Sequence, residues 1–306
     1  MKRRDFFLKS AGVGLGLGAV MSLGSYKTLT AGPSAFALPD MAAVRGGEPD
    51  VMFDRAIAAM GGMEHFVKKG QKVVVKPNIG WDVPPERAAT TNPLLIKRIV
   101  QHCYQAGAKE VLVFDNTCDT WTKCYKDSGI EKYVKSARGK MVPGNTEGYY
   151  QEIELARGKR LKKVKVHELV LDSDVFINVP ILKSHDAAKL TISMKNLMGV
   201  IWDRRYWHRN DLNQCIADYA TYSRKPDLVV VDAYNVMMKN GPRGVSKSDV
   251  VKMKAQIVTT DMVAADAAAA KIFGVDPASI RYIRLAHEMH AGNIDLSKLN
   301  ISRIKI

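Results

Sequence analysis

The chain has 306 residues, of which 46% are hydrophobic and 25% are charged, as is typical of a folded globular protein. Its formal net charge of +15 at pH 7 favours acidic ligands or anionic surfaces as partners. Nucleic acid is not expected among them, because the sequence contains no recognised nucleic-acid-binding motif. Beyond the N-terminus, no segment reaches the roughly 18 consecutive apolar residues that a membrane span requires.

Residues 1–37 have the features of an export signal. Residues 2–9 read KRRDFFLK and resemble the twin-arginine motif, in which paired arginines precede an aromatic residue, a leucine and a lysine. The apolar run 11–24 is rich in glycine and too short for an ordinary membrane span, and residues 35–37 (AFA) form an A-x-A cleavage site. We therefore expect the twin-arginine translocase as a partner and a periplasmic mature chain of residues 38–306, exported in the folded state. Retention through an uncleaved N-terminal anchor is the alternative.

The mature chain stays basic without this signal. Residues 1–37 carry five basic side chains and one acidic side chain, so residues 38–306 keep a net charge of +11.

Apolar runs alternate with amphipathic segments along the mature chain. After an irregular lead-in at 38–50, we predict helices at 54–68, 93–106, 130–136, 211–222, 262–273 and 277–287. Buried strands are predicted at 71–76, 110–114, 164–170, 174–179, 227–231 and 256–260. Segment 190–198 fits either a strand or a helix, and the basic run 157–163 is expected as a turn between strands. The alternation predicts a single α/β domain with a mixed, mainly parallel sheet and helices on both faces.

The cysteines identify no cofactor. Cys103, Cys118, Cys124 and Cys215 form no C-x-x-C pair, so no iron–sulfur or zinc-ribbon motif is readable, and a metal ion stays open. Cys118 and Cys124 are six residues apart and could form a disulfide in the periplasm. Cys103 lies on an apolar helix face and is expected as a core thiol.

Polar residues follow the ends of five predicted strands. They are Lys76-Pro77-Asn78, Asp115-Asn116, Lys183-Ser184-His185, Asp232 and Asp261. The carboxyl ends of parallel strands meet at one edge of a sheet, where open α/β sheets bind ligands, so we expect lysines, carboxylates and amides to converge in one cleft. The stretch 180–199 adds Lys195 and Asn196, which are polar inside an apolar segment. A buried lysine is costly unless it meets a carboxylate or a ligand.

Four of these residues are candidates for catalysis. Lys183 and Lys195 would neutralise the charge of a substrate, and His185 would transfer a proton or bind a metal ion. Asp232 would orient a lysine or complete a metal site. Asp261 is a third metal candidate, although a helix begins directly after it and favours a helix-capping role instead.

Other residues are candidates for ligand binding. Lys76 and Asn78 lie two residues apart on an extended segment and therefore share one side, and Asn196 is expected to join them. The turn Gly241-Pro242-Arg243-Gly244 either wraps an anion with backbone N–H groups and the Arg243 guanidinium or is a plain turn. Residues 202–208 (WDRRYWH) fit equally a lid over a planar or anionic ligand and an amphipathic cover of the sheet.

The order of these blocks resembles the bacterial and archaeal family called domain of unknown function 362. The resemblance rests on Lys76-Pro77-Asn78, Lys183-Ser184-His185, the KNLMG block 195–199, Asp232 with the 241–244 turn, and the DMVAAD block 261–266. It covers residues 70–275 and implies the fold and the position of the site more than a reaction. Many members of the family append a ferredoxin-like segment with two cysteine-rich cluster motifs. This chain lacks that segment, so iron–sulfur electron transfer is not carried over.

Two classes of function fit these residues. In the first, the chain is a periplasmic enzyme, redox or metal-dependent, whose basic cleft binds an anionic small molecule or cofactor. In the second, it is a non-catalytic binding or accessory protein that holds an anionic cofactor or assists a periplasmic redox partner. The sequence contains no complete catalytic constellation, so whether the chain is an enzyme stays open.

Overall fold

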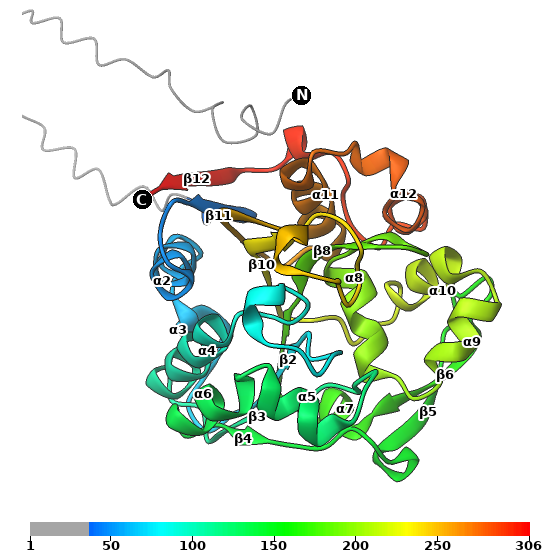
Figure 1. Cartoon of the computed structure of the whole chain (residues 1–306), viewed down its shortest axis with the longest axis horizontal. Coiled ribbons are helices and arrows are strands. Elements are labelled where there is room, and N and C mark those ends of the chain that lie inside the picture. Colours follow the sequence, from blue (N-terminus) through cyan, green and yellow to red (C-terminus); the bar gives the residue numbers. More distant parts are fainter. Residues whose placement is uncertain (1–36) are drawn as a thin grey trace, which may run out of the picture.

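A large β-sheet runs through the computed structural model, which describes residues 37–306 (Figure 1). The predicted signal segment, apart from Ala37, lies outside the described residues. The sheet has ten strands in the order β12-β1-β11-β10-β7-β2-β3-β4, with β8 paired to β10 and β9 paired to β8. The strands are β1 (Met41–Arg45), β2 (Lys72–Pro77), β3 (Glu110–Val113), β4 (Lys140–Met141), β7 (Val175–Val179), β8 (Ile181–His185), β9 (Lys189–Thr191), β10 (Leu228–Met237), β11 (Val250–Thr259) and β12 (Ile301–Lys305). A separate antiparallel pair is formed by β5 (Tyr150–Glu154) and β6 (Lys163–His167).

The strand directions confirm a mixed, mainly parallel sheet. Strands β10, β7, β2, β3 and β4 are joined by successive parallel pairings, and β8 is also parallel to β10. β11 runs antiparallel to both β10 and β1, and β9 runs antiparallel to β8. The carboxyl ends of β2, β3 and β7 therefore meet at one edge, whereas β11 ends at the opposite edge.

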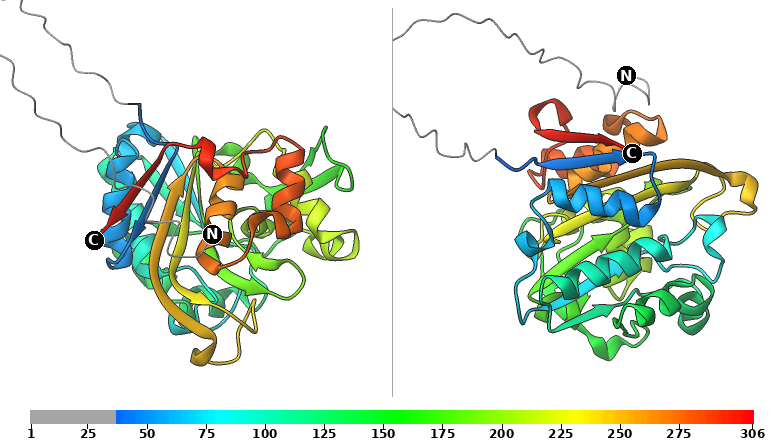
Figure 2. Two further views of the ribbon diagram at one scale, coloured as in Figure 1. Left: turned by 90° about the horizontal axis from the view of Figure 1, so that it is seen from above. Right: turned by 90° about the vertical axis from the view of Figure 1, so that its left-hand side faces the viewer.

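Helices cover both faces of the sheet, as predicted (Figure 2, left). Val73 and Val75 of β2 pack with residues of α2 (Pro49–Ala59), α4 (Pro93–Gln105) and α6 (Ile130–Ser136). Val74 points to the other core, with residues of α10 (Leu212–Tyr219), α11 (Met262–Phe273) and α12 (Arg281–Glu288). Side chains alternate between the two faces of a strand, so an unbroken apolar run fits burial on both sides. The shorter helices are α3 (Met63–Phe66), α5 (Trp121–Asp127), α7 (Glu168–Asp172), α8 (Ser193–Asn196) and α9 (Arg204–Arg209).

Local signals explain why two of the long helices begin where predicted. Asn92 accepts a hydrogen bond from Leu94 N at 3.0 Å, and Pro93 occupies the first position of α4. Asp261 accepts hydrogen bonds from Val263 N and Ala264 N at the start of α11. That helix ends at Gly274, whose φ of +96° is the left-handed conformation that glycine adopts without strain.

Several predicted elements differ from the structure. The lead-in 38–50 contains β1, which pairs with β11 and with β12 near the C-terminus; β12 was not predicted. The helix predicted at 54–68 is divided into α2 and α3, because Gly61 and Gly62 between them both have positive φ. The strand predicted to end before Asp232 continues to Met237, since β8 and β11 pair with its second half.

Three further segments need correction or completion. The strand predicted at 164–170 ends at His167 and is followed by α7, and the last predicted helix is a 3-10 turn, Pro277–Ser279, followed by α12. Segment 190–198, left open between strand and helix, contains the end of β9 and the whole of α8.

Cys118 and Cys124 are free thiols, so the disulfide between them is not formed in this structure. Within residues 37–306, no helix has the length and apolar character needed to cross a bilayer.

Candidate functional site

A cleft of about 450 Å³ lies at the carboxyl ends of the parallel strands. Six of the predicted site residues line it, namely Lys76, Asn78, Lys183, His185, Lys195 and Asn196. They come from β2 and the residue that follows it, from β8, and from α8. A larger hollow of about 610 Å³ lies against β6, but none of the predicted strand-end residues lines it. The smaller cleft is therefore the candidate site.

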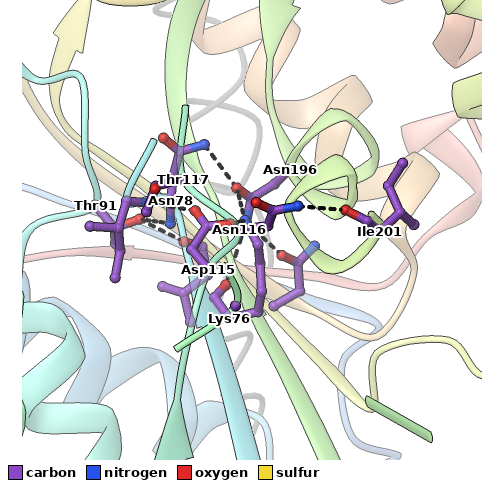
Figure 3. Close-up of polar contacts among 12 residues, drawn as sticks. Lys76, Asn78, Thr91, Asp115, Asn116, Thr117, Asn196 and Ile201 are labelled. Atoms are coloured by element: carbon purple, nitrogen blue, oxygen red, sulfur yellow. Dashed lines mark hydrogen bonds and ion pairs between the residues drawn. The ribbon is translucent and has the colours of Figure 1, made fainter. Parts of the chain in front are cut away.

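The base of the cleft is a buried ion pair that links β2 to the end of β3 (Figure 3). Lys76 Nζ lies 3.0 Å from Asp115 Oδ1 and donates to Asn196 Oδ1 at 2.8 Å. The second carboxylate oxygen of Asp115 accepts from Ile79 N at 2.7 Å. Burial lowers the pKa of Lys76 and raises the pKa of Asp115, and the attraction between the two charges opposes both shifts. The sequence identified Asp115 only as a polar residue at the end of a strand. The structure shows that it is the ion-pair partner of Lys76.

Lys183 is held at the next position of the cleft wall. Its Nζ donates to Asn78 Oδ1 at 3.1 Å and to the Ala89 carbonyl at 2.5 Å, and the side chain is 1% exposed. Burial without a carboxylate partner lowers the pKa of Lys183 to about 7. Asn78 in turn donates to Asn196 Oδ1 at 2.9 Å, so one amide network joins the two lysines.

Lys195 differs from these two lysines because its amine makes no hydrogen bond or ion pair to any residue within 37–306. The residue is partly buried and lines the cleft. Burial, followed by the positive charges of Arg204 and Lys76, lowers the pKa of Lys195 to about 8, against an opposing effect of Cys118.

The short helix that carries Lys195 is anchored from beneath. The buried Asp266 carboxylate accepts from Ser193 N at 2.7 Å and from Met194 N at 3.2 Å, which satisfies two N–H groups at the start of α8. Asn178 of β7 donates to the Ser193 carbonyl and hydroxyl at 3.0 and 3.1 Å. The sequence signal for this anchor is a carboxylate, Asp266, inside an alanine-rich helix.

His185 is a neutral side chain in this cleft. Burial, with Lys195 and Lys183 nearby, lowers its pKa to about 2. Its Nδ1 lies 3.2 and 3.3 Å from the backbone nitrogens of Ala187 and Ala188 and 2.9 Å from Asp186 Oδ1. The ring of His208 stacks on it, with centroids 6.3 Å apart.

The segment 202–208 forms one wall of the cleft through Arg204, Arg205 and His208. Arg204 donates to the carbonyls of Asn116 and Thr117 at 2.7 and 2.6 Å, and its Nη1 lies 3.4 Å from Cys118 Sγ. Sequence reasoning assigned no single residue of this segment to the site. The basic and aromatic character of residues 202–208 was the sequence signal for a role in the site. Their position could not be predicted, because only the folded chain brings α9 beside the strand ends.

Close packing at Gly199 keeps the base of the cleft closed. Its carbonyl accepts from Asn116 N at 2.9 Å, and a Cβ atom at this position would lie 2.6 Å from Lys76 Nζ and overlap the Asp115 carboxylate. The glycine of the KNLMG block is therefore needed for the ion pair beneath it.

Asp232 does not line the cleft. Its carboxylate accepts from Asn92 N at 2.7 Å and from Tyr234 N at 3.0 Å, on the face of the sheet that α4 covers. Burial raises the pKa of Asp232 to about 6. Among the described residues it makes no hydrogen bond or ion pair with Lys183 or Lys195, so the predicted role of orienting a lysine is wrong in this structure.

Asp261 lies at the opposite edge of the sheet, because β11 runs antiparallel to β10. It caps α11 and also accepts from Asn293 N at 2.7 Å, as the capping interpretation requires. Its inclusion with the other strand ends is therefore wrong. The metal candidates His185, Asp232 and Asp261 lie apart, and no group of three or more His, Cys, Asp or Glu residues within 37–306 is placed to hold a metal ion.

The 241–244 turn contacts neighbouring loops at the rim of the cleft. Arg243 pairs with Asp82 at 2.7 Å and with Asp119 at 3.2 Å, so its guanidinium is already matched with carboxylates. Gly241 N donates to Ser184 Oγ at 3.1 Å, and Pro242 is the residue of the turn that lines the cleft. Gly241, Arg243 and Gly244 are thus not among the lining residues, and the structure favours the plain-turn interpretation.

The fold and this cleft define an α/β protein with a basic site at the carboxyl edge of its parallel strands. Residues 73–271 match the family described as domain of unknown function (DUF362), and the chain belongs to this family. A relative from Synechocystis sp., described as a thylakoid-associated protein, is 27% identical over 229 residues, which cover 72% of this chain and 68% of the relative.

Two solved structures resemble the fold. The lactate racemase apoprotein of Thermoanaerobacterium thermosaccharolyticum matches with a TM-score of 0.44 and 14% identity, over 70% of this chain and 53% of that chain. A Thermotoga maritima protein solved as a structural genomics target matches with a TM-score of 0.46 and 10% identity, over 79% of this chain and 60% of that chain. The chain thus spans little more than half of either protein.

Proposed function

We propose that the cleft binds a small anionic molecule or an anionic cofactor. The observation that carries this proposal is the Lys195 amine, which lines the cleft and has no partner within residues 37–306. Five Lys and Arg side chains line the cleft against two carboxylates, those of Asp115 and Asp186. Because an uncompensated buried or partly buried cation is costly, a site with this excess gains stability from a bound anion. The volume of about 450 Å³ lies within the range of small-molecule sites.

The basic side chains have different roles in this proposal. Lys76 is neutralised by Asp115 and shapes the base of the cleft, whereas Lys195 and Arg205 are the cations left for the ligand. Arg204 is oriented by two carbonyl groups, which fixes its guanidinium for contact with an anion. His185 offers a hydrogen-bonding imidazole that stays neutral near pH 7.

An enzyme is the second candidate, and Lys183 is the observation that favours it. A buried amine with a pKa of about 7 can give or take a proton at neutral pH, as acid–base catalysis requires. If the cleft performs no chemistry, the chain acts as a binding or accessory protein that holds an anionic cofactor for a periplasmic redox partner.

We also propose that the chain is exported to the periplasm by the twin-arginine translocase. The support is the KRRDFFLK motif with the AFA cleavage site that follows it. A chain exported in the folded state would carry its ligand across the membrane inside the cleft.

Calorimetric titration of sulfate and of oxalate into the folded chain tests the binding proposal. We expect both anions to bind, and Lys195→Gln to lose about 1.5–3 kcal/mol of binding free energy, the value of one charge-assisted contact. The matched control is Lys132→Gln, which removes an exposed lysine of α6 outside the cleft. Equal affinities of the wild type and Lys195→Gln would contradict the proposal.

A further inference from the structure

Three lysines share the cleft, but only one offers a free lone pair to a ligand. Lys76 is ion-paired with Asp115, and Lys183 donates to Asn78 and to the Ala89 carbonyl. Lys195 has no such partner among residues 37–306 and is less buried than the other two. An attacking amine must be accessible and must not be held by other hydrogen bonds, so only Lys195 meets both conditions.

The surroundings of Lys195 are those that make a lysine amine nucleophilic. It lies in a partly desolvated cleft with other cations, Arg204 and Lys76, which disfavour its protonated form and lower its pKa to about 8. Desolvation and a neighbouring positive charge are the two means by which proteins prepare lysines for imine formation with carbonyl compounds. A pKa of about 8 leaves roughly a tenth of the amine neutral at pH 7, far more than in an ordinary lysine.

The remaining groups of the cleft suit the other half of such a ligand. Arg205 lines the cleft and is exposed, and Arg204 is fixed by backbone carbonyls, so a carboxylate placed beside Lys195 would meet guanidinium groups. His185 is neutral, and the ring of His208 stacks on it with centroids 6.3 Å apart. Burial lowers the pKa of both rings, so they offer the ligand neutral hydrogen-bonding groups and do not serve as acids near pH 7.

We propose that Lys195 forms an imine with a small anionic carbonyl compound, an aldehyde acid or a 2-oxo acid, bound in the cleft. The inference rests on the proposed anion binding and names its ligand class. The neutral Nζ attacks the carbonyl carbon, and a C–N bond forms while the C=O π bond breaks. The resulting carbinolamine loses the nitrogen proton and the hydroxyl group, which leaves as water after protonation. No electrons are gained or lost, and hydrolysis reverses the step.

Reductive trapping with glyoxylate, the smallest aldehyde acid, tests the inference on the folded chain. Sodium cyanoborohydride reduces an imine to a stable secondary amine, which intact mass and peptide mapping locate. We expect the adduct on Lys195 at glyoxylate concentrations about tenfold below those that modify Lys132, a difference of about 1.4 kcal/mol. Lys183 should remain unmodified, because its amine is held and 1% exposed. Oxalate, which has the charge but no carbonyl group able to form an imine, should protect Lys195.

One variant, compared with the wild type, keeps the test interpretable. Lys195→Arg retains the positive charge but cannot form an imine at this pH, so it should bind oxalate and give no adduct in the cleft. Melting temperatures of both proteins show whether the variant is folded. Oxalate binding without a trapped adduct on Lys195 would overturn the imine while the anion site stands. Failure of sulfate and oxalate to bind would overturn the anion site itself. If Lys195 needed as much glyoxylate as Lys132 to form the adduct, the imine proposal would be overturned.

Discussion

The Lys76–Asp115 pair shows how one buried interaction shapes the whole cleft. Each side chain is at most 3% exposed, so each charge alone would be costly in this position. The 3.0 Å contact and the hydrogen bonds from Ile79 N and to Asn196 Oδ1 compensate both charges. Such pairs do not add much stability over an apolar replacement, but breaking them leaves an unpaired buried charge.

At this scale, Lys76→Met should cost about 3–5 kcal/mol of unfolding free energy, because Asp115 is left buried without its cation. Adding Asp115→Leu should recover part of that loss. Denaturant unfolding of the two single variants and the double variant measures both effects. The control is Lys135→Met, which breaks the exposed pair with Glu131 on α6 and should change stability by less than ~0.5 kcal/mol. Additive effects of the two substitutions would contradict the pairing.

At the scale of elements, the turn after α8 packs directly against the Lys76–Asp115 ion pair. Residues 197–200 form a 3-10 turn whose Gly199 lies against Lys76 and Asp115 without room for a side-chain carbon. The position of α8 is fixed from the other side by Asp266 and Asn178. The element therefore cannot move away to make room for a larger residue.

Gly199→Ala should destabilise the protein by about 1–3 kcal/mol, as overpacking does, and should weaken anion binding by displacing the ion pair. Gly148→Ala is a fair comparison, since a Cβ atom there has no neighbour within 4 Å. Thermal unfolding and sulfate titration of both variants give the two readouts. If Gly199→Ala unfolded like Gly148→Ala, the packing described for this turn would be wrong.

At the scale of the whole molecule, the parallel centre of the sheet was predictable and its edges were not. Apolar runs such as residues 73–75 and 175–177 mark central strands, because they are buried on both faces. Strands β1 and β12 pair with each other from the two ends of the described chain, and no local pattern signals that pairing (Figure 1).

The same reason explains which site residues were predicted. Lys76, Asn78 and Lys183 follow from the shared edge of parallel strands, whereas Asp261 was misplaced because the direction of β11 is not readable from its sequence. Asp232 was misplaced because its strand continues and turns the side chain to the α4 face. Arg204 and His208 reach the site because α9 packs beside the strand ends. Neither residue follows a strand, so the expectation that strand ends form the site could not identify them.

Export is a property of the whole chain and is tested separately from the cleft. The double variant Arg3→Lys and Arg4→Lys should abolish the periplasmic mature form, because the translocase reads the paired arginines. Cell fractionation with detection of the chain measures this, with Lys27→Arg, outside the motif, as the control. An unchanged periplasmic fraction in the double variant would show that another route carries the chain.

The measurement that tests the central claim most directly is the sulfate titration repeated at about pH 6.5 and about pH 9.5, at constant ionic strength. Sulfate keeps its charge over this range, so a change in affinity reports on the protein. The groups around Lys195 are Lys76, Cys118, Lys183, His185, Asp186, Arg204 and His208, and its pKa of about 8 lies between the two conditions. We predict binding at least about tenfold weaker at the higher pH in the wild type, because Lys195 and Lys183 both lose positive charge, and a clearly smaller decrease in Lys195→Gln, in which only Lys183 still titrates. Equal affinities of the wild type at the two pH values, or no binding at either, would contradict an anion site built around Lys195.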